Sequence, residues 1–168
     1  LEQVRLTLAQ QDYQLAHILS RKISTKVFDD ETFHDLKLRF YELMIRIGLH
    51  NDEYLEITRY YHHVLTTPSV AEDASKWQDI LANVVYFIIL SPYDNEQSDF
   101  LHRIAADKRL LELPMHNELI KCFTTLELMR WPRIEEIYGV HLRKTPVFTA
   151  GDARAEQRYT ALKTRVIE

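Results

Sequence analysis

The sequence predicts an all-α fold in which helical hairpins stack into an α-solenoid. Only three glycines occur in 168 residues, which argues against hairpin-rich β folds because those folds need residues at positive φ. Apolar residues follow the helical period in nearly every segment. The stretch 33–49 carries two apolar stripes, and the run 84–90 is apolar on all sides. Helices buried on two sides are typical of a stacked array.

A weak internal repeat supports the same fold class. Six positions recur after a shift of 41 residues, in the pairs Leu6 and Ile47, Asp12 and Glu53, Tyr13 and Tyr54, Ala16 and Ile57, Leu19 and Tyr60, and Ile23 and Val64. A period of about 40 residues is within the range of two-helix repeats. Strict tetratricopeptide spacing is absent, so the array is expected to be only tetratricopeptide-like. A four-helix bundle is the alternative, and an expected total of about nine helices weighs against it.

In the N-terminal half, start and stop signals separate the expected helices. Asp12 is expected to start one helix, and the acidic residues 29–31 favour the N-terminus of the next. Gly48 followed by Asn51 indicates a stop and a restart. Residues 69–72, with the letters SVAE, have capping-box spacing, which predicts the start of a long helix.

That long helix is expected to end at Leu90, at the clearest boundary in the chain. Pro92 cannot donate a backbone hydrogen bond, and it disfavours helix at the residue before it. Asp94 can accept from the first amides of the next helix, and Gln97 is expected to reach back, as in a capping box. A break this short predicts that two helices fold back on each other.

Prolines also divide the C-terminal part of the chain. Pro114 precedes an apolar face that is expected to extend through Leu126 and Met129. Pro132 is expected near the first helical position of the next helix, where its missing amide costs little. Residues 143–152 are expected to form a loop before a last helix.

Composition narrows the class of protein. The formal net charge of −4 gives no basic stripe, so we expect no nucleic-acid partner. No signal peptide opens the chain and no apolar run approaches the ~20 residues that span a bilayer, so we expect no membrane partner. Cys122 is the single cysteine and cannot form an internal disulfide. We expect it to be a small buried hydrophobe in a reducing compartment.

Motifs that carry catalysis are missing from the sequence. It contains no glycine-rich phosphate loop, no paired cysteines, and no zinc-protease or serine-hydrolase motif. Glu31 and His34 have the ExxH spacing of di-iron bundles. That chemistry needs a second such motif and two further inward carboxylates, and only residues 99–102 approach the motif. We therefore expect no catalytic residue, no cofactor and no metal site, and predict that the chain is not an enzyme.

Protein contacts are the remaining role for conspicuous side chains. The candidate interface residues are Tyr93, Asp94, Glu96, Arg130 and Trp131. Tryptophan and arginine are enriched at interface hot spots, although burial between repeats explains Trp131 equally well. Capping and solvation explain most of the acidic segment 94–99. Tyr54, Tyr60 and Tyr61 are candidates for a peptide-docking surface, and their helical spacing favours core packing instead.

Two long stretches resemble a known family. They are Leu90–Ile104, with the letters LSPYDNEQSDFLHRI, and Phe123–Trp131, with the letters FTTLELMRW. Both are similar to signature stretches of the non-ATPase regulatory subunit 12 family of the 26S proteasome lid. Shorter matches continue the resemblance in the same order, at 12–16, 36–45, 138–144 and 162–166. The sequence departs from the family's pattern around 145–156.

The resemblance implies a non-catalytic scaffold subunit that supports ubiquitin-dependent protein degradation through protein–protein contacts. It implies an α-solenoid that runs into the helical part of a PCI module. We expect a helical-repeat array at 1–144, a loop at 145–152, and a final helix at 153–168 leading toward a winged helix that this fragment lacks. The implied partners are other lid subunits, including PCI-type neighbours and the deubiquitinase module, in a hetero-oligomer. The implied location is the cytoplasm and nucleus.

The residues alone leave further functions open. The chain could be the paralogous subunit of the COP9 signalosome, or a free helical-repeat adaptor that binds peptides in a concave groove. The adaptor hypothesis requires Tyr54, Tyr60 and Tyr61 to be accessible to solvent. An α-helical metalloenzyme is the most distant hypothesis.

Overall fold

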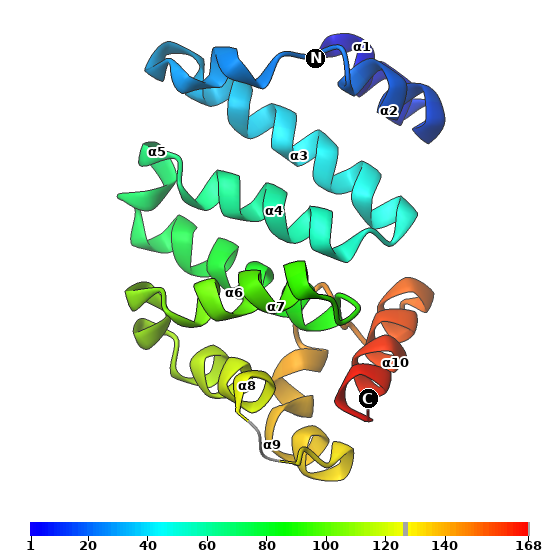
Figure 1. Cartoon of the computed structure of the whole chain (residues 1–168). Coiled ribbons are helices and arrows are strands. Elements are labelled where there is room, and N and C mark those ends of the chain that lie inside the picture. Colours follow the sequence, from blue (N-terminus) through cyan, green and yellow to red (C-terminus); the bar gives the residue numbers. More distant parts are fainter. Residues whose placement is uncertain (126–127, 168) are drawn as a thin grey trace. The chain divides into compact units, whose positions relative to one another are not determined.

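The computed structural model describes residues 1–125 and 128–167. Within this part the chain forms ten α-helices and three 3₁₀ helices and no strand, which confirms the predicted all-α fold class (Figure 1). The chain divides into two compact units, Leu1–Val84 and Val85–Glu168. Helix α6 (Ala74–Leu90) runs through the division, and all seven residues of its apolar run 84–90 are buried, as predicted.

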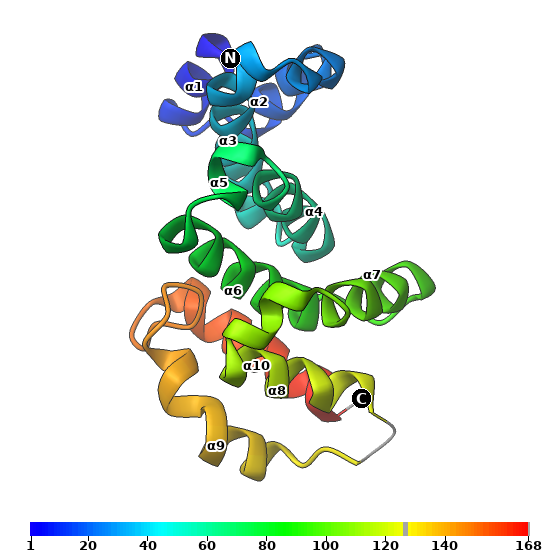
Figure 2. The ribbon, with the colours of Figure 1, turned by 90° about the vertical axis from the view of Figure 1, so that its left-hand side faces the viewer.

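The first unit is built from helical hairpins. Its elements are α1 (Glu2–Ala9), α2 (Tyr13–Ser20), 3₁₀ helices at Thr25–Asp29 and Glu31–Phe33, α3 (His34–Asn51), α4 (Tyr54–Leu65), the single turn α5 (Pro68–Ala71) and the first part of α6. Helix α1 pairs with α2 and α3 with α4, and α2 packs against α3 (Figures 1 and 2). Successive hairpins therefore stack on each other within this unit.

The two hairpins turn in the same way, 41 residues apart. Gln11 and Asp52 both adopt the left-handed conformation, with φ of 60° and 56°. In each hairpin the amide of the next residue donates to the carbonyl oxygen five positions back, on Thr7 at 2.9 Å or on Gly48 at 3.0 Å. This is the Schellman hydrogen bond of a helix C-terminus. The structure thus confirms the repeat, but the prediction that Gly48 stops the helix is wrong, because Asp52 does so.

Gly48 instead lets two helices approach closely. A Cβ atom on Gly48 would lie 2.8 Å from Cγ1 of Ile57 on α4. Ile57 is fully buried, and so is Ala16, which holds the equivalent position on α2. Thr7, also buried, stands where the second hairpin has Gly48. The small and the large side chain have therefore exchanged places between the two repeats.

Both predicted apolar stripes of α3 are buried along most of the helix. The buried residues are Phe40, Tyr41, Leu43, Met44, Ile45, Ile47 and Gly48. Near its start the helix is more open, with Phe33 and Leu36 exposed at 36% and 39%. Aromatic contacts extend this core, since Phe28 lies 5.3 Å from Phe40 and Tyr41 stacks on His63 at 5.1 Å. Burial on two sides is the pattern of a helix inside a stack.

The start of α6 differs from the prediction. Residues 68–71 form the separate turn α5, with Pro68 in its first positions, and α6 begins only at Ala74. The carboxylate of Asp73 accepts from the amide and the hydroxyl of Ser75, at 3.0 and 2.6 Å. The capping box predicted at 69–72 is therefore wrong, because an aspartate two residues before Ser75 supplies a stronger local acceptor.

The second unit holds the remaining helices. They are the end of α6, α7 (Asn95–Ala105), a 3₁₀ helix at Lys108–Glu112, α8 (Pro114–Thr124), α9 (Trp131–Arg143) and α10 (Ala153–Ile167). Helix α7 packs on α8, and α9 on α10. Pro132 lies in the first helical positions, as predicted, and so does Pro114, for which no such position was predicted. Helix α8 ends before Met129, so the predicted helical extension to that residue is wrong, and Leu126 lies outside the described residues.

The segment between α9 and α10 has no regular secondary structure, yet it is firmly packed. Phe148 is fully buried, with its ring edge-on to Tyr86 at 5.8 Å and to Tyr159 at 6.1 Å. The Arg158 guanidinium donates through Nε to the carbonyl oxygen of Val147 at 2.7 Å. An aromatic anchor and a satisfied carbonyl thus hold this connection against the unit's core.

Cys122 is less buried than the sequence predicted. It lies half-buried on α8, and its side chain hydrogen-bonds with the Tyr138 hydroxyl on α9. Burial, and then the neighbouring Cys122, raise the pKa of Tyr138 to about 12. The thiol therefore links two successive helices of the second unit.

Candidate protein-interaction surface

The break between α6 and α7 is held by two different hydrogen bonds. Asp94, in extended conformation, accepts the Gln97 amide at 2.6 Å, which confirms the predicted cap. The Gln97 side chain does not hydrogen-bond to the backbone of Asp94, so the prediction of a full capping box is wrong. Its Nε2 donates instead to the carbonyl oxygen of Ile88 at 3.1 Å. Carbonyls in the last turn of a helix lack α-helical donors. The Ile88 carbonyl also accepts from the Ser91 amide at 3.3 Å, and the Gln97 side chain adds a second bond that fixes α7 to α6.

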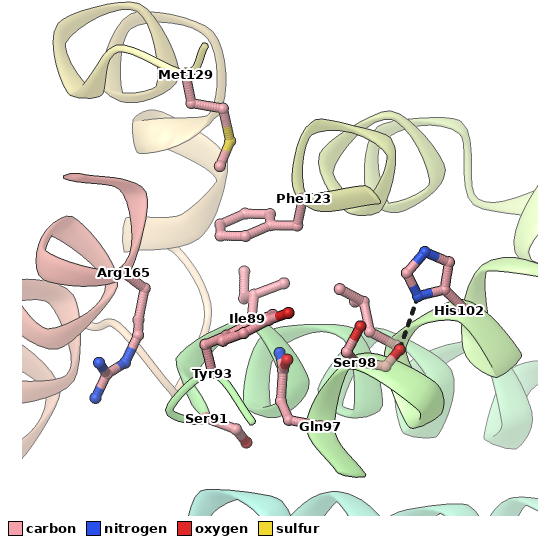
Figure 3. Close-up of a pocket in the computed structure, with 10 residues that line it drawn as sticks. Ile89, Ser91, Tyr93, Gln97, Ser98, His102, Phe123, Met129 and Arg165 are labelled. Carbon is pink, nitrogen blue, oxygen red and sulfur yellow. Dashed lines mark hydrogen bonds between the residues drawn. The ribbon is translucent and has the colours of Figure 1, made fainter. Parts of the chain in front are cut away.

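A groove of about 520 Å³ opens beside this contact (Figure 3). Its lining residues are Ile89, Ser91, Tyr93, Gln97, Ser98, Leu101, His102, Phe123, Met129 and Arg165. In Figure 3 the Phe123 ring lies across from Ile89 and Tyr93. The hydroxyl of Ser91 donates to the carbonyl oxygen of Phe87 at 2.9 Å, so this polar group in the groove wall already has a partner. The groove therefore offers mainly apolar surface to a binding partner.

Three of the predicted interface residues lie at the surface beside the groove. Tyr93 lines it and is 78% exposed. Asp94 and Glu96 are exposed on the segment that follows. Exposed tyrosine next to apolar surface is a frequent feature of protein interfaces. The structure thus places an exposed tyrosine in the groove wall and two exposed carboxylates on the segment that follows it.

The remaining two predicted interface residues separate from each other. Arg130 is exposed immediately before α9. Trp131 is only 8% exposed, and its ring lies edge-on to Tyr159 of α10 at 5.2 Å. Burial is therefore the correct interpretation of Trp131, because the first turn of α9 folds onto α10. Trp131 is a core residue of the second unit and not a surface anchor.

Tyr159 is the centre of a charged cluster that the sequence did not reveal. The Arg143 guanidinium lies 3.7 Å from its ring centroid and pairs with Glu156 at 2.5 Å. The Tyr159 hydroxyl donates to the Glu135 carboxylate at 3.1 Å. Burial first, and then Glu135, raise the pKa of Tyr159, while the hydrogen bond from Arg143 lowers the pKa of Glu156. These groups bind one another, so the cluster stabilises α9 against α10.

A second hidden contact joins α6 to α8. The Tyr86 hydroxyl and Nε2 of His116 lie 2.7 Å apart. Burial raises the pKa of Tyr86 to about 12, whereas burial and the charge of His141 lower the pKa of His116. A protonated tyrosine beside a neutral imidazole means that the hydroxyl donates and the ring accepts. The residues are 30 positions apart, and no sequence pattern pairs them.

The tyrosine cluster of α4 meets the adaptor requirement only in part. Tyr54, Tyr60 and Tyr61 are all half-buried. The ring of Tyr60 lies 6.0 Å from Tyr41, and burial raises its pKa to about 12. Tyr61 also lines a second groove of about 600 Å³, within the first unit. The cluster is thus divided between core and surface.

The described part of the chain contains neither a metal-binding cluster nor a membrane-spanning helix. In residues 1–125 and 128–167, no three His, Cys, Asp or Glu side chains gather in a way that could hold a metal ion. Across the same residues, no helix has the length and apolar character needed to cross a membrane.

Comparisons with known proteins agree with the family resemblance found in the two long sequence stretches. The family described as PSMD12/CSN4, N-terminal, matches residues 1–73. Over 168 residues the chain is 52% identical to the 26S proteasome regulatory subunit rpn501 of Schizosaccharomyces pombe. It is 40% identical to the 26S proteasome regulatory subunit RPN5 of Saccharomyces cerevisiae over the same length. With the 26S proteasome non-ATPase regulatory subunit 12 homolog A of Arabidopsis thaliana the identity is 36% over 191 aligned positions.

These alignments include the whole of this chain but only part of each relative. The chain spans 38% of the two yeast proteins and 43% of the plant protein. It is therefore similar, along its full length, to one segment of these 26S proteasome regulatory subunits. Residues 126–127 of the second signature stretch lie outside the described residues.

Proposed function

We propose that this relative of the 26S proteasome regulatory subunits is a non-catalytic scaffold segment of the regulatory-particle lid. In this role it supports ubiquitin-dependent protein degradation through protein–protein contacts. The observation that carries the proposal is the identity of 52% over the entire chain to a protein named as such a subunit. The stacked helices agree with it, because repeat arrays present extended surfaces to partners.

The break between α6 and α7 is the first contact surface in this proposal. Packing explains Gln97, which is 5% exposed and bonded to Ile88. Packing does not explain Tyr93, which remains 78% exposed beside an apolar groove. An exposed aromatic ring at the edge of a groove gains most when a partner covers it. We assign Tyr93 to a contact with a neighbouring subunit.

Partners and location belong to the same proposal. We infer that the full-length protein assembles with other lid subunits, including PCI-type neighbours and the deubiquitinase module, as part of a hetero-oligomer. Its location would be that of the assembly, the cytoplasm and nucleus. The three relatives are all named as regulatory subunits of the 26S proteasome, which supports assembly with proteasome subunits.

Affinity purification of the tagged full-length protein tests the proposal. Recovery of the regulatory-particle subunits is expected, and recovery of none would overturn it. A pull-down dominated by signalosome subunits would favour the paralogue instead, which the family description PSMD12/CSN4 also covers.

Tyr93→Ala tests the assigned contact. It is expected to weaken retention of neighbouring subunits in a salt wash, because it removes exposed surface without disturbing the core. Leu111→Ala, which truncates a side chain 69% exposed elsewhere in the same unit, is the matched control. Equal retention for both variants would remove Tyr93 from the interface.

A further inference from the structure

Helix α9 has an apolar row on the side that faces away from the core. Its buried side is formed by Trp131, Ile134, Tyr138 and Leu142. Ile137 and Val140 nevertheless remain 49% and 65% exposed. At about 100° per residue, these two side chains lie about 60° apart, with Ile137 at the edge of the buried side and Val140 opposite it. The packing of the second unit therefore leaves two β-branched side chains uncovered.

Basic residues stand at both ends of this pair. Arg133 lies four positions before Ile137, and Lys144 lies four positions after Val140, so all four fall in one row. Both are exposed, and within the described residues no ion pair joins either of them to a carboxylate. We call Arg133, Ile137, Val140 and Lys144 the α9 row. It is about 16 Å long at 1.5 Å per residue, or three helical turns.

The remaining charged groups of α9 leave the row positive. Glu135 points to the opposite side, where it accepts from Tyr159. Arg143 is engaged with Glu156. Glu136 borders the row next to Val140, and His141 borders it on the other flank, both exposed. One carboxylate at the edge does not balance two cations in the row.

We propose that the α9 row docks an amphipathic helix of a neighbouring subunit whose apolar residues are flanked by carboxylates. The inference rests on the proposed function and adds a second surface and its partner chemistry. Apolar residues at i and i+3 provide the kind of anchor that a partner helix buries, and the cations at the two ends select acidic neighbours. A second copy of this chain would present the same cations and be repelled.

Photo-crosslinking in the assembled complex tests the proposal. The full-length protein, with a benzoylphenylalanine at position 140, is incorporated into purified regulatory particles and irradiated. The expected product joins residue 140 to a helix of another subunit. That helix carries Asp or Glu within one turn of its crosslinked residue. Crosslinks only to the same polypeptide, or to a segment without carboxylates, would overturn it. The same probe at Leu111 is the positional control.

Charge variants separate electrostatic selection from simple contact. Arg133→Glu combined with Lys144→Glu is expected to lower the crosslink yield about tenfold, the sum of two surface ion pairs replaced by repulsion. Glu136→Gln is expected to raise the yield, and added salt should reduce it in the wild type. Yields that do not respond to any of these changes would overturn the proposed partner chemistry.

The two proposals fail in different ways. If the tagged protein is absent from the purified particle, the proposed lid function fails. If it is present and Val140's position gives no intersubunit product, only the assignment of the α9 row fails.

Discussion

The hairpin α1–α2 and the hairpin α3–α4 share a backbone but not a set of side chains. Both end their first helix with a left-handed residue, Gln11 or Asp52, and with the same hydrogen bond five positions back. At the contact between Gly48 and Ile57 in the second hairpin, the first hairpin has the buried residues Thr7 and Ala16 at the equivalent positions. The total volume at the contact is similar, while its distribution between the helices is reversed.

This difference explains why the repeat is weak in sequence and strong in geometry. Close packing constrains the sum of the volumes that meet between two helices more than either volume alone. A pattern search compares single positions and so loses the signal. The Schellman turn keeps the spacing, since the backbone conformation at one residue fixes where the second helix begins.

The largest effect is expected from emptying the second contact. Ile57→Ala removes a fully buried side chain opposite a glycine, where no neighbouring Cβ can fill the space. We expect a loss of about 2–5 kcal/mol in the free energy of unfolding. Urea denaturation monitored by the fluorescence of Trp77, which lies in the same unit, measures it. A loss well under 1 kcal/mol would mean that Ile57 does not support this contact.

Transferring the first contact into the second hairpin is the sharper experiment. Gly48→Thr alone is expected to cost about 1–3 kcal/mol, because its Cβ would meet Ile57 at 2.8 Å. In the double variant with Ile57→Ala, the added volume fills the space that the smaller side chain leaves. The loss should then be smaller than the sum of the two single losses by about 1 kcal/mol or more. Additive losses would show that the two hairpins are not equivalent at this position.

The two hairpins also differ in helix capping, and this difference is expected to have a smaller effect on stability. The Asp12 carboxylate accepts from the Leu15 amide at 3.0 Å, whereas Glu53 at the equivalent position makes no side-chain cap. We expect Asp12→Ala to cost about 1 kcal/mol. Glu53→Asp should stabilise the second hairpin by giving it the cap of the first. Thermal unfolding compares both variants with the wild type, and an unchanged midpoint for Asp12→Ala would contradict the assigned cap.

The smallest expected difference is in pH dependence. His63 on α4 stacks on Tyr41 of α3, while the first hairpin has Lys22 at the equivalent position. Burial, and then the charges of Lys37 and Arg59, lower the pKa of His63 below its ordinary value of 6.5. The folded state then binds fewer protons than the unfolded chain between these two pKa values. The contribution of His63 to stability is therefore complete above pH 6.5 and is lost as the pH falls through this window.

His63→Phe keeps an aromatic ring on Tyr41 and removes the titration. Denaturation midpoints measured across this pH range should fall less steeply in the variant than in the wild type. Parallel curves would show that His63 does not contribute to the acid sensitivity of the first unit.

Local signals in the sequence predicted the elements better than their contacts. Pro92, Asp94 and Pro132 act through their own backbone or the next turn, and each lies where the sequence predicts it. Gln97 is predicted to close the local cap and instead reaches Ile88, nine residues away. Sequence reasoning does not assign Trp131 to core or surface, since its partner Tyr159 is 28 positions further along the chain and belongs to another helix.

Periodicity and turn chemistry were sufficient to predict the all-α class and the break after Leu90, because both act within a few residues of the chain. The recurrence of six positions gave a weak prediction of the repeat of 41 residues. The packing of the helices was needed to learn that Trp131 is buried, that Tyr93 is exposed, and that Ile137 and Val140 stay uncovered. Exposure depends on which helix packs on which face. That choice is made by volumes and charges brought together from distant positions, as in the exchange between Gly48 with Ile57 and Thr7 with Ala16.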